Sequence, residues 1–331
     1  MVIAVIFGSL IGELTEEETG GSMWTGKVTI YYFFTGVIYP AIAIFLRHAL
    51  RQRSYVAWGL FGLAMVSPLQ SVIFAGRREA TAQVLLTIGL TLFFQRRVTA
   101  PRWMVALAAA SAMLIIPATG TYRAIASTRE WDDVKQMDLV GNFQEFINNE
   151  SILELRNAAM YIHATESLGN YGLGVAYWDE LVWRFVPAQI VGNDLKKFLL
   201  VARDDQDFDN EFARAGFMIS VGSTITGMGD SYSQFGYFGA LVFGLMGHFF
   251  RRLWTGACES GGIFTQLLYI GSVTSAMRAV THQTSDFLPG VVYQLIFLAC
   301  LYFWVRKPTA PKAAGIGTPS GGPAMDAEVR E

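Results

Sequence analysis

The stretch GSTITGMGDSYSQFGYFGALVFGLMGHFFRRLW, residues 222–254, decides how this chain is interpreted. It begins as a polar segment punctuated by glycines that holds one carboxylate, Asp230. It continues as an uncharged run over residues 235–250 that ends at Arg251 and Arg252. A run of this length is typical of a bilayer-spanning helix, and a basic end of this kind normally faces the cytoplasm. We therefore expect Asp230 to lie in a loop just above the opposite, external membrane surface.

The composition of the whole chain supports a membrane protein. Of its 331 residues, 52% are hydrophobic and only 16% are charged, which is too apolar for an ordinary soluble domain. Apolar segments lie at residues 2–12, 28–46, 55–75, 80–95, 103–121, 235–250, 263–277 and 287–305. The predicted fold class is an all-α polytopic membrane protein with about eight transmembrane helices and one large external, mostly helical loop.

Positive charge between these segments predicts the topology. The basic groups are Arg47, Arg51 and Arg53; Arg96, Arg97 and Arg102; Arg251 and Arg252; and Arg306, Lys307 and Lys312. Alternating spans place all four groups on one side, which the positive-inside tendency makes the cytoplasm. The predicted divisions are an N-terminal bundle of about five spans over 1–121, an external loop over 122–234, C-terminal spans over 235–307 and a disordered cytoplasmic tail over 308–331.

The external loop itself has a helical pattern. From Leu139, apolar residues recur near helical spacing, which predicts an amphipathic helix on the membrane or on the bundle. If a helix continues past Arg156, that arginine, His163 and Glu166 share one of its faces. Gly169 and the glycines after it are expected to end this helix.

The charge rule disfavours arginines at external turns, yet Arg77 and Arg78 occupy one. Two interpretations fit them: a clamp for an anionic ligand, above all a phosphate, or an anchor that snorkels to lipid headgroups. Arg123, Arg278 and His282 lie at other external span ends, so several cationic or polar groups face one region.

For acid–base chemistry the candidates are Asp230 and Glu166, either of which could take a proton from a hydroxyl group. Arg156, His163 and Arg184 are candidates to orient a substrate. Structural roles are open for two of these residues: Asp230 as a cap of the following helix, and His163 as an interfacial histidine. The acidic run at 205–211 lacks the glycine turn of a calcium-binding hand, and the two cysteines suggest no metal site, so we predict no metal and no cofactor.

Four stretches carry a resemblance to a family. They are AGRR at 75–78, PATGTYR at 117–123, GLGVAYWDELVWRFVP at 172–187 and TGMGDSYSQFGYFG at 226–239. Together they resemble the Wzy-type O-antigen and exopolysaccharide polymerases, the oligosaccharide repeat-unit polymerases of bacterial inner membranes. Ala188 and Gln189 depart from the pattern, since relatives carry basic and aromatic residues there, and relatives commonly have ten or more spans.

The resemblance implies an enzyme, a membrane glycosyltransferase of polysaccharide biosynthesis. It would polymerise repeat units linked to undecaprenyl diphosphate, without a metal, at the external face of the inner membrane. The implied partners are the lipid-linked oligosaccharide, membrane lipids, a chain-length regulator and a flippase, with no nucleic acid. Aromatic residues would stack on sugar faces or, equally, form an interfacial belt; they are Tyr171, Tyr177, Trp178, Trp183 and Tyr232. An O-antigen ligase with a lipid A acceptor, a transporter or flippase for lipid-linked sugars, and a structural membrane subunit are the alternatives.

Overall fold

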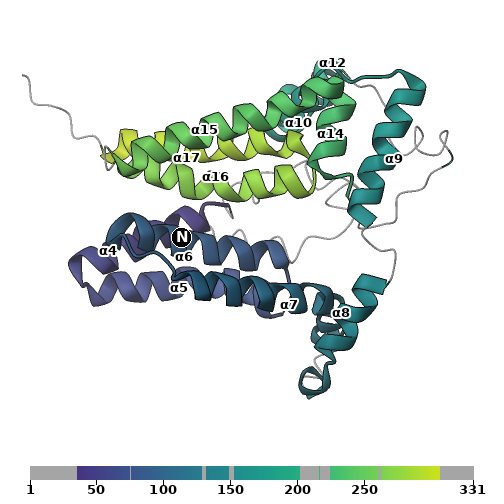
Figure 1. Ribbon diagram of the computed structural model, residues 1–331. Coiled ribbons are helices and arrows are strands. Elements are labelled where there is room, and N and C mark those ends of the chain that lie inside the picture. The colour runs from purple at the N-terminus through teal and green to yellow at the C-terminus, as the bar shows by residue number, and fades with distance from the viewer. Residues whose placement is uncertain are drawn as a thin grey trace, which may run out of the picture.

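The computed structural model describes residues 36–74, 76–128, 132–148, 153–201, 216, 224–259 and 262–305. Within these residues the chain is all-helical and contains no strand, as predicted. The long helices are α4 (Ile38–Gln52), α5 (Tyr55–Ile73), α6 (Arg78–Arg96), α7 (Arg102–Thr128), α15 (Ala240–Cys258), α16 (Ile263–Thr281) and α17 (Phe287–Val305). They run roughly parallel to one another and form the bundle seen in Figure 1.

Shorter helices gather at one end of this bundle, on the right in Figure 1. They are η1 (Asp133–Gln136), α8 (Leu139–Asn148), α9 (Leu153–Leu168), α10 (Val175–Phe185), α11 (Ala188–Val191), α12 (Asn193–Leu199), α14 (Thr226–Phe235), η2 (Gly236–Gly239) and η3 (Thr284–Asp286). The predicted helix from Leu139 is α8. It does not continue past Arg156 as one helix, because α8 ends at Asn148 and Arg156 lies on a separate helix, α9. The predicted end at the glycines is observed, since α9 stops at Leu168 and Gly169 follows with a φ of +63°.

Three described helices are long and apolar enough to cross a membrane: Tyr55–Ile73, Arg102–Ala126 and Thr284–Val305. They indicate a membrane protein, but the predicted count of about eight spans is not confirmed. Segment 2–12 lies outside the described residues. The other bundle helices do not meet this criterion: α4 has only 15 residues, and α16 includes the buried polar residues Gln266, Ser272 and Thr274.

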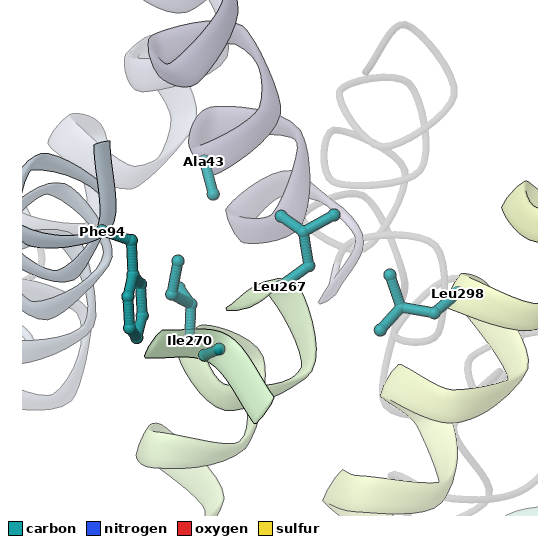
Figure 2. Close-up of a cluster of buried hydrophobic side chains, with 6 residues drawn as sticks. Ala43, Phe94, Leu267, Ile270 and Leu298 are labelled. Carbon is teal, nitrogen blue, oxygen red and sulfur yellow. The ribbon is translucent and has the colours of Figure 1, made fainter. Parts of the chain in front are cut away.

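Helix α16 joins the two halves of the bundle that the loop separates in sequence. One hydrophobic cluster unites α4, α5 and α6 around Ile42. A second unites α4, α6, α15, α16 and α17, and Figure 2 shows its side chains Ala43, Phe94, Leu267, Ile270 and Leu298. Small residues such as Ala43 let the helices approach closely, which matters in lipid because packing replaces the hydrophobic effect as the source of association.

The end opposite the short helices carries the basic turns. Arg96 Nη2 donates to the carbonyl oxygen of Leu50 at 3.3 Å, and Arg97 Nη2 donates to that of Cys258 at 2.9 Å. These bonds tie the ends of α4, α6 and α15 together, as the alternating topology predicts. The basic tail lies outside the described residues, and which end faces the cytoplasm stays a prediction.

Two details of the predicted course of the chain are wrong. Arg251 and Arg252 do not end a helix, because α15 continues to Cys258. Its last turns still have partners in the bundle: Ala257 is buried, and the Trp254 ring stacks on Phe93 with 5.2 Å between centroids. In addition, the segment around Asp230 is not a loop but the helix α14.

Candidate functional site

Helix α14 is helical despite its glycines because they allow close contact with two neighbours. A Cβ atom on Gly227 would lie 2.0 Å from the carbonyl oxygen of Ala279 in α16, and one on Gly229 would lie 3.2 Å from Cα of Ala158 in α9. These glycines were expected to turn the backbone; they instead pack helices. Residues two positions apart point to nearly opposite sides of a helix, so α16 and α9 flank α14.

Asp230 is buried on α14, with 5% of its surface exposed. Its Oδ2 accepts hydrogen bonds from the backbone N–H of Thr284 at 2.7 Å, from that of Ser285 at 3.2 Å and from the Thr284 hydroxyl. Asp230 therefore caps the start of η3, which leads into α17. The prediction that it caps the helix after its own segment is wrong, because its partners are 54 and 55 residues further along the chain.

The environment of Asp230 alters its proton affinity. Burial raises the pKa of this carboxyl above its ordinary value, the hydrogen bonds from Thr284 and Ser285 oppose that rise, and the neighbouring Asp286 adds to it. The net effect is a carboxyl group that holds a proton at higher pH than an exposed aspartate does.

A chain of hydroxyl groups leads from Asp230 toward the surface. The Tyr177 hydroxyl lies 2.5 Å from Oγ1 of Thr284. Since the Thr284 hydroxyl donates its hydrogen to Asp230, its oxygen accepts from Tyr177. Burial raises the pKa of Tyr177 to about 12, so this phenol is neutral at physiological pH. Tyr177, Thr284 and Asp230 form a continuous path for a proton.

An ion-pair network runs beside this path. Arg184 of α10 is buried and pairs with both Glu180 and Asp286. The other oxygen of Asp286 pairs with Nη2 of Arg278 at 3.2 Å. Nε of Arg278 lies 3.7 Å from Glu79, which is too far for a hydrogen bond. Charges of alternating sign thus connect α10, η3, α16 and the start of α6.

The segment 76–79, which we call the arginine turn, collects further cations. Arg77 and Arg78 are its exposed central residues. Arg123 near the end of α7 donates its Nε–H to the carbonyl oxygen of Gly76 at 3.2 Å, and Nε of Arg278 lies 3.7 Å from Oε1 of Glu79. Four arginines from three separate parts of the chain therefore gather around one turn, at the end of the bundle that carries the short helices.

The structure does not bring all the predicted site residues together. Arg156, His163 and Glu166 are exposed on α9, on the far side of α14 from Arg278. Glu166 accepts a hydrogen bond from the Tyr232 hydroxyl. His282 is exposed at the end of α16, where its Nδ1 lies 2.8 Å from Oγ1 of Thr281.

Several residues that organise the site were not predicted. Gln234, one turn after Asp230, is buried and accepts hydrogen bonds from the amides of Gly174 at 3.1 Å and Ala176 at 3.3 Å, so it caps α10. The sequence Thr284-Ser285-Asp286 directly before an apolar span is a helix-start signal that could have been recognised. Glu180 and Gln234 carry no comparable local signal.

No group of three or more His, Cys, Asp or Glu side chains in the described residues is arranged to hold a metal ion. No protein-family model, curated protein or solved structure matches this chain. The resemblance to the Wzy-type polymerases stays a prediction.

Proposed function

We propose that this protein transfers glycosyl groups between oligosaccharides linked to polyprenyl diphosphate, and so polymerises repeat units at the external face of the bacterial inner membrane. The observation that carries this proposal is the gathering of Arg77, Arg78, Arg123 and Arg278 at the arginine turn. The turn lies at the end of an apolar bundle, the level at which the diphosphate of a membrane-anchored lipid would lie.

The arginines suit the leaving group of this reaction. The bond between the anomeric carbon and the diphosphate oxygen breaks, and its electron pair stays on the diphosphate. Guanidinium groups bind phosphate oxygens through paired hydrogen bonds and stabilise the charge that develops there. Two acids offset these four cations: Glu79 lies within the arginine turn, and Asp286 pairs with Arg278.

The hydroxyl chain suits the acceptor. As the acceptor oxygen bonds to the anomeric carbon, it must lose its proton. We assign Tyr177 to receive this proton while its own passes through Thr284 to Asp230, along hydrogen bonds that already exist. Arg184 and Arg278 position η3 through Asp286. Glu166 lies on the other side of α14 and is not assigned to this step.

The test replaces the two ends of the hydroxyl chain. Asp230→Asn keeps an oxygen that can cap η3 but is a far weaker base, and Tyr177→Phe keeps the ring that packs against Phe235. Loss of a general base typically lowers a rate by about 10²–10⁴-fold. We expect both variants to be expressed and folded, and to lose the ladder of lipid-linked polymer in a complementation assay. Tyr55→Phe, at a tyrosine that is 92% exposed, is the control.

A normal ladder from both variants would refute the proposed proton path. An O-antigen ligase would use the same residues, so the product distinguishes the two enzymes: a ladder of repeat units for a polymerase, and transfer to lipid A for a ligase. A transporter is disfavoured because its substrate groups belong near the middle of the bilayer, whereas these charged groups lie at the end of the bundle.

A further inference from the structure

Three tyrosines and one carboxylate converge on the α9 side of α14, outside the site described above. We call Tyr171, Tyr232, Tyr237 and Glu166 the tyrosine platform. The Tyr232 hydroxyl donates to Oε1 of Glu166. The Tyr232 ring lies 6.3 Å from that of Tyr171, tilted by 55°, and 5.5 Å from that of Tyr237, at 85°. The four residues come from α9, the segment after it, α14 and η2.

The backbone holds these side chains in place. The amide of Gly172 donates to the carbonyl oxygen of Ser233 at 3.0 Å, and that of Leu173 to Gln234 at 2.8 Å, so the segment that carries Tyr171 is tied to α14. Gly236, with a φ of +59°, turns the chain between Tyr232 and Tyr237, and a Cβ atom there would lie 3.4 Å from the Tyr171 ring. The platform is therefore built before any ligand arrives.

The platform is also open to a ligand. Tyr237 is 83% exposed, Tyr171 is 36% exposed, and Glu166 is exposed on α9. The hydrogen bond to Glu166 raises the pKa of Tyr232, so its phenol stays protonated. The surface thus offers apolar ring faces, phenol groups that donate and accept, and a carboxylate that only accepts.

A pyranose ring matches this combination, since it has C–H groups on its faces and hydroxyl groups around its rim. We infer that the tyrosine platform binds a sugar ring of the oligosaccharide, an inference that rests on the proposed function for the source of the sugar. The arginine turn lies across α14, and a helix with its side chains is about 10–12 Å wide. The bound sugar is therefore not the one that reacts but one further along the same chain, which the platform grips during transfer.

Tyrosines near a membrane also serve as interfacial anchors, and Phe238 separates the two roles. It follows Tyr237 directly in η2 and is 75% exposed. If this surface were a membrane anchor, Tyr237 and Phe238 would both insert into the membrane interface. A sugar site would use Tyr237, which contacts Tyr232, together with Glu166.

The experiment measures binding without turnover. The probe is the oligosaccharide released by mild acid from the lipid-linked pool of the source bacterium, which carries no phosphate. Its affinity for the detergent-purified full chain is measured by titration calorimetry. We expect Tyr237→Ala and Glu166→Gln each to weaken binding by about three- to tenfold, the usual effect of losing one aromatic or one charge-assisted contact. Phe238→Ala, the matched control, should bind as the wild type does.

Three results would overturn the inference: no binding to the wild type at millimolar probe, unchanged binding by both Tyr237→Ala and Glu166→Gln, or equal weakening by Phe238→Ala. The second would leave the tyrosines as a membrane anchor, and the last would mean that disturbed packing of η2, and not a lost sugar contact, weakens binding. Failure of the proposed function would look different. It would appear as a failure of the wild-type chain to restore the ladder of lipid-linked polymer in the complementation assay. Asp230→Asn should bind this phosphate-free probe normally in either case.

Discussion

Replacing Arg184 by methionine tests whether the ion-pair network holds α10 against the bundle. Methionine preserves much of the length of the side chain but leaves Glu180 and Asp286 without their shared cation. The Arg184 side chain is only 7% exposed and that of Asp286 only 10% exposed, so little water can replace the lost partner.

The size of the effect follows from the burial of each partner. Removing one member of a buried ion pair usually costs about 3–5 kcal/mol. The cost here should be lower, because Asp286 keeps Arg278 at 3.2 Å and the Glu180 side chain is 25% exposed. We expect about 2–3 kcal/mol, which corresponds to a roughly 30- to 150-fold increase in local opening.

Hydrogen exchange followed by mass spectrometry measures this opening directly. Amides in the peptide that covers α10 (Val175–Phe185) should exchange faster by about that factor, while those of α5 should not change. Arg184→Lys keeps the charge but loses the planar fork, so its α10 amides should exchange at a rate between those of the wild type and Arg184→Met. Lys135→Met is the matched control, because the Lys135–Asp132 pair is almost fully exposed and should contribute little.

Unchanged protection of α10 in Arg184→Met would refute this reasoning. It would mean that the other contacts of α10, such as the amide bonds to Gln234 and the Tyr177–Thr284 hydrogen bond, hold the helix in place without the ion pairs. Equal effects of Arg184→Met and Lys135→Met would show that burial does not strengthen the network.

Three further predictions follow from other contacts. Gly227→Ala should lower the thermal unfolding midpoint, because overpacking usually costs about 1–3 kcal/mol, whereas Gly244→Ala, with nothing within 4 Å of its added Cβ atom, should not. The folded state raises the pKa of Asp230 and therefore binds this proton more tightly than the unfolded state does. The thermal unfolding midpoint should fall as pH rises from about 4 through the raised pKa. The Asp230→Asn variant should not show this fall. In a variant without native cysteines, an impermeant maleimide should label Lys135→Cys in intact spheroplasts and Arg51→Cys only after lysis; the reverse pattern would invert the proposed sidedness.

The sequence by itself predicted the fold class of the protein and the positions of many of its helices. Apolar runs and helical periodicity are local properties. They correctly predicted that the described residues are all-helical, the start of α8 at Leu139 and the end of α9 before Gly169, and three apolar helices support the predicted membrane class. The predicted number of spans is not confirmed, because length and apolarity along the chain do not reveal which helices bury polar side chains such as Gln266.

Only the tertiary structure decided what the polar residues of the site contact. Gly227 and Gly229 suggested a turn, yet they pack α14 between α16 and α9, because a glycine has the same local signal in both roles. Asp230 caps a helix 54 residues away, and Arg184 pairs with Asp286 across 102 residues. Periodicity and helix-capping preferences describe neighbours along the chain, whereas such bonds exist only once packing has placed α10, α14 and η3 side by side.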